Sequence, residues 1–206
     1  MLLLSCIPCS ALAVGNVGLQ NGDLLFQEGC SGDVSDAIKG VTSSVDGYHF
    51  THVGIVWINR SDTFVIEAIR PRVAVTPLRA YLHPDGEACP PLSVAARLKE
   101  PFRRLIPRAI EEALRLVGKE YDDAFVLNND KYYCSELVYE IFLRANDGKP
   151  VFQLNTMTFK AKGSDGFMPE WVEYYAKLGL PVPEGESGIN PGAMSRSEAV
   201  EIVGKP

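Results

Sequence analysis

The chain has 206 residues, of which 46% are hydrophobic and 22% charged, and its formal net charge is −6. This length and composition fit one globular domain with a substantial core and exclude an intrinsically disordered chain. The negative charge argues against nucleic acid or an anionic membrane as the main partner, and no apolar stretch is long enough for a transmembrane segment.

The first thirteen residues are predicted to be a targeting segment. Residues 1–13 contain no charged side chain and end in Ala-Leu-Ala at 11–13, a cleavage pattern typical of a secretory signal peptide. The usual basic region is missing. The sequence Leu-Leu-Ser-Cys at 3–6 also resembles a bacterial lipoprotein box, which would place a lipid anchor on Cys6, and a buried first strand is a third possibility. We therefore expect a secreted or periplasmic protein, either free or lipid-anchored.

Cleavage after residue 13 would leave three cysteines, Cys30, Cys89 and Cys134. In an oxidising compartment Cys30 and Cys89 could pair and leave Cys134 free, although spacing alone does not establish the pair. These three cysteines form no CxxC motif, and the histidines lack a third well-spaced partner for zinc. We expect no metal and no other cofactor.

Hydrophobic periodicity and turn residues predict the following elements in chain order. Strands are expected at 22–26, 52–58, 63–69, 73–78 and 92–98, with the second and third forming a hairpin. Helices are expected at 33–45, from 107 to 117, through 134–145 and at 169–178. The segments 79–91, 150–167 and 181–191 are rich in turn residues and are expected to be loops or irregular structure.

The helix that carries Cys134 is the centre of the functional prediction. Its apolar residues at 134, 137, 138, 141, 142 and 145 trace one face, and Asn129 or Asp130 can cap its start. Cys134 would then lie in the first turn, where the partial positive charge of the helix terminus favours a thiolate. Such a cysteine is a nucleophile if a base reaches it, and otherwise it is a small core residue.

The hairpin offers that base. If Ile58 pairs with Thr63, His52 lies diagonal to Glu67 on the same face; a two-residue loop at 59–60 would place the two directly opposite each other. A neighbouring carboxylate fixes the tautomer of a histidine and raises its basicity. Cys134, His52 and Glu67 would thus act as nucleophile, base and orienting residue.

Further side chains are candidates for contacts to the substrate. Tyr133, Tyr121 and Asp23 could bind the substrate or an oxyanion, although packing is the usual role of a tyrosine. Arg70 and Arg72 follow the second hairpin strand and could meet a substrate carboxylate or form a solvated strand end.

Five stretches resemble the permuted NlpC/P60 cysteine peptidases of the YiiX/YebB-like group: GDLLF at 22–26, THVGIV at 51–56, VIEA at 65–68, GKEYD at 118–122 and YYCSELV at 132–138. The tail PEGESGINP at 183–191 is similar to the C-terminal signature of that group. The resemblance implies an α+β, circularly permuted papain-like NlpC/P60 fold, in which an antiparallel sheet packs against the helix bearing Cys134. It implies one catalytic domain over residues 14–206, with His52 as base, Cys134 as nucleophile and Glu67 as third polar residue.

Relatives in that superfamily cut amide bonds in peptidoglycan stem peptides or transfer lipid acyl chains. We therefore expect a secreted cysteine amidohydrolase that acts on cell-wall-derived peptides, with a peptide or a lipid-linked small molecule as substrate. One alternative is a lipid acyl hydrolase or acyltransferase that uses the same three residues. Another is a binding protein that has the fold but no activity.

Overall fold

The computed structural model describes residues 17–30, 32–84, 89–161 and 163–206. The predicted signal peptide and the predicted anchor at Cys6 lie outside these residues. Within the described ranges, no helix combines the length and the apolar character needed to cross a membrane.

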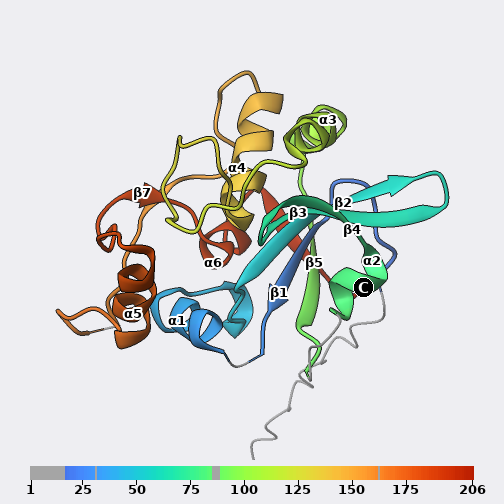
Figure 1. The fold of residues 1–206 in the computed structure, drawn as a ribbon. Helices are drawn as coiled ribbons and strands as arrows, with labels where there is room; N and C mark the ends of the chain where they lie inside the picture. The colour runs from blue at the N-terminus through green and yellow to red at the C-terminus, as the bar shows by residue number, and fades with distance from the viewer. Residues whose placement is uncertain (1–16, 31, 85–88, 162) are drawn as a thin grey trace, which may run out of the picture.

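A six-stranded antiparallel sheet forms the centre of the molecule, with the order β4-β3-β2-β1-β5-β8 (Figure 1). Its strands are β1 (Leu24–Glu28), β2 (His52–Asn59), β3 (Asp62–Ile69), β4 (Arg72–Pro77), β5 (Leu92–Leu98) and β8 (Val200–Gly204). In the central strand β1, Leu24 and Phe26 enter the main core, while Leu25 belongs to a smaller cluster. Successive side chains of a strand point to opposite faces, so the two clusters cover opposite faces of the sheet. Since both faces are buried, β1 has a continuous apolar run.

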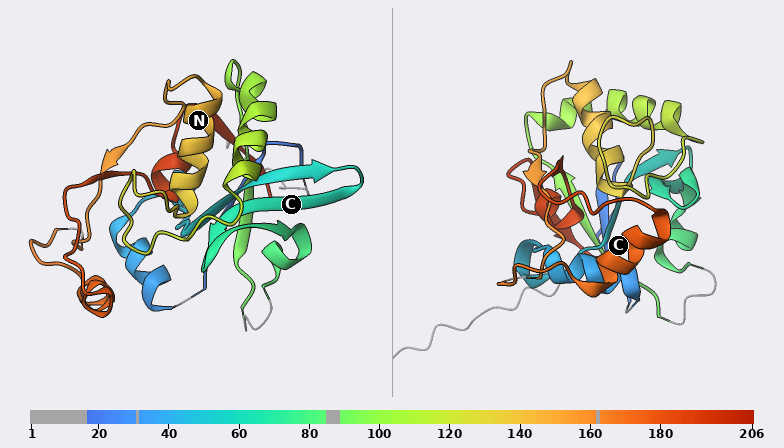
Figure 2. Two further views of the ribbon diagram at one scale, coloured as in Figure 1. Left: turned by 45° about the horizontal axis from the view of Figure 1, so that its top comes forward. Right: turned by 60° about the vertical axis from the view of Figure 1, so that its left-hand side comes forward.

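The helices divide between the two faces. They are α1 (Asp33–Val41), α2 (Leu78–Leu82), α3 (Ile106–Leu116), α4 (Cys134–Ala145), α5 (Pro169–Leu178) and α6 (Pro191–Ser195). Helix α4 packs against β2 and β3 and lies beside α3, as Figures 1 and 2 show. Helix α2 covers the smaller cluster through Tyr81. Two short 3₁₀ turns (Val45–Gly47 and Phe102–Leu105) and a two-stranded ladder of β6 (Asn155–Thr156) and β7 (Ser187–Gly188) complete the fold.

The hairpin register with Ile58 opposite Thr63 is confirmed. The prediction of loop throughout 79–91 is wrong at its start, because α2 extends to Leu82 and buries Tyr81. The irregular tail is also only partly irregular. Residues 187–188 pair with β6, and α6 begins at Pro191 with the Asn190 side chain accepting the Ala193 N–H at 2.8 Å.

Helix α4 begins at Cys134, so the predicted caps at Asn129 and Asp130 are wrong. Asp130 has a positive φ of 60°, which belongs to a turn and not to a helix start. The residue that precedes the helix is Tyr133, whose backbone is extended and whose N–H donates to the Glu136 carboxylate at 3.3 Å. This contact between the residue before the helix and a side chain of its first turn stabilises the start of α4.

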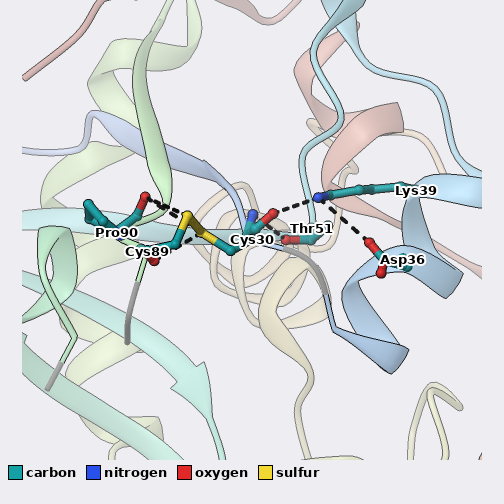
Figure 3. Close-up of a disulfide and its surroundings, with 7 residues drawn as sticks. Cys30, Asp36, Lys39, Thr51, Cys89 and Pro90 are labelled. Carbon is teal, nitrogen blue, oxygen red and sulfur yellow. Dashed lines mark hydrogen bonds and ion pairs between the residues drawn. A yellow bond between two sulfur atoms is a disulfide. The ribbon is translucent and has the colours of Figure 1, made fainter. Parts of the chain in front are cut away.

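Cys30 and Cys89 form a disulfide and leave Cys134 as the free cysteine of the described residues (Figure 3). The disulfide joins the segment after β1 to the segment before β5. At the outer ends of the described chain, the Val17 N–H donates to the Lys205 carbonyl at 2.8 Å, so these two ends lie together.

Candidate active site

The Cys134 thiol lies at the N-terminus of α4, and the residue is only 6% exposed. Leu137, Val138 and Ile141 of the same helix are fully buried and hold it against the sheet. The first N–H groups of a helix have no acceptor within the helix, so those around Cys134 are available to a substrate. The sulfur therefore lies beside a set of oriented backbone donors.

His52 and Glu67 form the second part of the site. His52 Nε2 lies 2.6 Å from Glu67 Oε2; Glu67 is 2% exposed and the His52 side chain 20%. The two strands approach closely here, because a Cβ added to Gly54 would lie 3.2 Å from Glu67 Cβ. Since Nε2 faces the carboxylate, Nδ1 is the ring nitrogen left for Cys134.

The pKa of His52 depends on both parts of the site, Cys134 and Glu67. Burial lowers the pKa of the His52 ring, whereas hydrogen bonds and charge interactions with Cys134 and Glu67 raise it. The net result is a pKa of about 10, against an ordinary value of 6.5. The ring is therefore protonated at neutral pH, and as an imidazolium it donates from both nitrogens.

Tyr81 supports the His52 ring and was missed by the sequence analysis. Its ring centroid lies 5.8 Å from that of His52, and its hydroxyl donates to the Leu25 carbonyl at 2.7 Å. Gln27, which pairs with His52 across β1 and β2, donates from Nε2 to the Tyr81 carbonyl at 2.7 Å. The leucines that flank Tyr81 at positions 78 and 82, four residues apart, are the signal that could have indicated this helical turn.

Two hollows that share three lining residues lie at the site. A cavity of about 240 Å³ is lined by Cys134, and a groove of about 520 Å³ is lined by His52 and Glu67. Ile38, Thr51 and Tyr121 line both. A substrate that crosses this boundary would therefore place one portion in the cavity, another in the groove and its reacting bond beside Cys134 and His52.

Tyr121 stands at that boundary. Burial and the nearby Cys134 raise the pKa of Tyr121 well above its ordinary value, so its hydroxyl stays protonated and can donate. The Arg70 guanidinium lies 4.7 Å above the Tyr121 ring and is itself held by Asp123 at 2.5 Å and Tyr174 at 2.7 Å. Arg70 thus fixes Tyr121 in place.

The two other predicted substrate contacts have structural partners. The Tyr133 hydroxyl accepts the Ile189 N–H at 3.2 Å, which ties the segment before α6 to α4, and Tyr133 also lines the cavity. Asp23 is not brought to the site: its carboxylate accepts two hydrogen bonds of 2.8 Å from Arg97. It precedes β1 and lies four residues before Gln27, the partner of His52.

The matches to known proteins extend over nearly the whole chain. A family model described as permuted papain-like amidase enzymes, YaeF/YiiX, family C92, matches residues 18–204. The chain is 30% identical over 187 residues to the uncharacterized protein YiiX of Escherichia coli strain K12. The aligned region covers 90% of this chain and 86% of that protein. It also matches a crystal structure described as the metalloprotein YiiX from Escherichia coli O157:H7, with a TM-score of 0.71, 26% identity and coverage of 91% of this chain and 97% of that one.

Proposed function

Because the chain belongs to the family of permuted papain-like amidases of the YaeF/YiiX group, we propose that it is an exported thiol amidase that cleaves an amide bond in cell-wall-derived peptides. One observation carries this proposal: the buried carboxylate of Glu67 lies 2.6 Å from His52 Nε2, and interaction with Cys134 raises the pKa of the same ring. The proposal includes membership of the wider NlpC/P60 group, which the motifs at 51–56 and 132–138 support. One catalytic domain from residue 14 to 206 is supported by the sheet, which combines β1 with β8.

The proposed reaction begins with attack of Cys134 Sγ on the carbonyl carbon of the scissile amide. The negative oxygen of the tetrahedral intermediate accepts from the Cys134 N–H and from the Tyr121 hydroxyl. His52 then gives its proton to the leaving nitrogen as the C–N bond breaks, which leaves a thioester on Cys134 and a neutral ring. Water attacks the thioester, His52 takes the proton of the water, and the acid is released.

A lipid acyl hydrolase or acyltransferase that uses the same residues is the second candidate. The cavity beside Cys134 supports it, because Phe125, Phe159 and Trp171 supply much of the wall and such walls suit hydrocarbon. An acyl ester would react by the same attack of Cys134, with an alcohol as the leaving group.

An exported location is proposed from two observations. The Cys30–Cys89 disulfide is typical of proteins that fold in an oxidising compartment. The uncharged N-terminal segment with its cleavage pattern would direct the chain there.

One relative is described as a metalloprotein. In the described part of this chain, no three side chains of His, Cys, Asp or Glu gather in a way that could hold a metal ion. The described residues thus do not provide a set of ligands that fits a bound metal, and no step of the proposed reaction involves a metal.

Hydrolysis assays with muropeptides and with acyl esters test the proposal. The wild-type protein should release a new amine from muropeptides, and Cys134→Ala should lower the rate by about 10³-fold or more. Equal rates for wild type and Cys134→Ala would overturn the proposed role of Cys134. Cleavage of esters alone would favour the lipid enzyme, and no hydrolysis together with an unreactive Cys134 thiol would favour a binding protein.

A further inference from the structure

The two hollows receive different halves of the substrate in the proposed reaction. A general acid must lie within hydrogen-bond reach of the atom that it protonates, and His52 protonates the leaving nitrogen. Among the described residues, His52 lines the groove but not the cavity, whereas Cys134 lines the cavity but not the groove. The leaving amine therefore lies in the groove. The acyl half, which becomes the thioester on Cys134, extends into the cavity.

The surface that the cavity presents to this acyl half is mostly apolar. Ile38 and Val41 of α1 and Met157, which follows β6, line it and are half-buried, so their side chains have accessible surface. Phe125 is 8% exposed and lines it as well. Contact with these side chains would remove an apolar group of the substrate from water, which favours binding.

Two hydroxyl groups of the lining are already used within the protein. Thr42 Oγ1 donates to the Ile38 carbonyl at 2.9 Å. Ser135 Oγ donates to the Ile189 carbonyl at 3.0 Å. Because both hydroxyls have acceptors, these positions do not require a polar group on the substrate.

Arg196 carries the one charge among the described lining residues. The residue is exposed, and its guanidinium donates to the Ser43 carbonyl. Water competes for an exposed charge and salt screens it, so an ion pair of Arg196 with a ligand would contribute little. The apolar surface therefore dominates selection in the cavity.

The wall next to Cys134 is held in place before a ligand binds. Tyr133 and Ser135 flank Cys134, and their side chains bond both backbone groups of Ile189. The Tyr133 hydroxyl accepts the Ile189 N–H at 3.2 Å, and Ser135 donates to the carbonyl of the same residue. A wall that is fixed in this way does not widen freely, so the cavity selects its ligand by size.

The volume of the cavity sets that size. An apolar cavity of about 150 Å³ binds benzene. By proportion, the cavity of about 240 Å³ has room for about nine or ten carbon atoms.

We propose that the cavity beside Cys134 is a subsite for a compact apolar group on the acyl half of the substrate, such as an aromatic or a branched aliphatic side chain. A methyl group would leave most of the apolar surface in contact with water, and a carboxylate would lose its hydration there. A palmitoyl chain would exceed the space. The inference rests on the proposed function and narrows it from amides in general to this class.

Alkylation of Cys134 by four chloromethyl ketones tests this, because the ketone carbonyl takes the place of the scissile carbonyl. Cys134 Sγ bonds to the CH₂ carbon, and chloride leaves. The group on the other side of the carbonyl is methyl, phenylethyl, carboxyethyl or pentadecyl. The rate constant is followed on the peptide that contains Cys134 and is divided by the rate constant of the same reagent with glutathione.

The normalised rate of the phenylethyl reagent should exceed that of the methyl reagent by about 10- to 100-fold, because a buried aromatic ring leaves water. The carboxyethyl and pentadecyl reagents should react about ten-fold more slowly than the phenylethyl reagent, or slower still.

Two variants change the volume of the cavity. Ala193→Leu, at a half-buried lining position, narrows it and should lower the ratio of the phenylethyl rate to the methyl rate by about ten-fold. Met157→Ala widens it and should raise the ratio of the pentadecyl rate to the methyl rate. Ala176→Leu, exposed on α5 and outside the lining, is the matched control and should keep the wild-type ratios. Each ratio compares two reagents on one protein, so a general loss of folded protein cancels.

Three results would overturn the inference: equal normalised rates for the phenylethyl and methyl reagents, a carboxyethyl or pentadecyl reagent that reacts faster than the phenylethyl reagent, or ratios that Ala193→Leu leaves unchanged. Fast alkylation of Cys134 in any of these cases would leave the proposed function standing. A Cys134 thiol that no reagent alkylates faster than it alkylates glutathione would overturn both, because the inference needs a reactive thiol.

Discussion

Replacing Glu67 by glutamine removes the carboxylate that holds His52 and keeps the length of the side chain. Glu67 is 2% exposed and lies 2.6 Å from His52 Nε2, so solvent does not take its place. The glutamine amide can still contact the ring, but only as a neutral group. The substitution therefore tests the charge of Glu67 separately from its shape.

The magnitude follows from the pKa of His52. Its rise from 6.5 to about 10 corresponds to about 5 kcal/mol of net stabilisation of the protonated ring, provided jointly by Cys134 and Glu67 against the effect of burial. A hydrogen bond to a charged group contributes about 1.5–3 kcal/mol and a neutral one about 1 kcal/mol. Glu67→Gln should thus lose the difference, about 0.5–2 kcal/mol, which is about 2- to 30-fold in the rate of a step that needs the imidazolium.

The assay is alkylation of Cys134 by iodoacetamide, followed on the peptide that contains this residue. At pH 7 the rate of alkylation in Glu67→Gln should fall by about 2- to 30-fold relative to the wild type. Glu111→Gln, at an exposed position of α3, is the matched control. An unchanged rate in a Glu67→Gln protein that melts like the wild type would refute the reasoning.

Three further predictions concern stability. Burial, followed by the nearby carboxylates, raises the pKa of Glu136 from 4.5 to about 8, so its stabilising contribution is present below pH 4.5 and is lost as the pH rises through 8. The free energy of unfolding of Glu136→Gln, measured in urea, should therefore rise by about 4 kcal/mol relative to that of the wild type between pH 5 and pH 9. A difference between the two proteins that stays constant with pH would contradict this. Gly54→Ala would place a Cβ 2.4 Å from Val65 Cγ1 and should cost about 1–3 kcal/mol by thermal melting, whereas Gly18→Ala, in open space, should cost little. Replacing both Cys30 and Cys89 by alanine opens a loop of 59 residues and should cost about 4 kcal/mol; a variant as stable as the oxidised wild type would contradict this.

The pairing of His52 with Glu67 could be predicted from the sequence because side chains alternate along a strand. Any shift of the hairpin by two residues keeps both on one face, so the prediction did not depend on the loop length. The position of Cys134 beside them could not be derived in this way. It depends on how α4 packs on β2 and β3. The sequence analysis grouped Cys134 with His52 and Glu67 by their chemistry alone, and the family resemblance implied the same three residues.

The cavity beside Cys134 could not be predicted from the sequence for the same reason. Phe125, Phe159 and Trp171 of its wall come from three separate segments, and each looks like an ordinary core residue in its local sequence. The last strand, β8, was also missed, because its five residues gain their place by pairing with β5 and not by a strong pattern of their own.

The hydrogen bond between Val17 and Lys205 has a consequence for protein engineering. Because these ends meet, a short linker between them would close the chain into a ring, and a new opening in the exposed loop at 128–130 would create new termini. In such a chain the helix that carries Cys134 would come first and the hairpin that carries His52 second. The contacts between α4 and the sheet would stay the same, so the order in which these two segments leave the ribosome is separable from the site that they form.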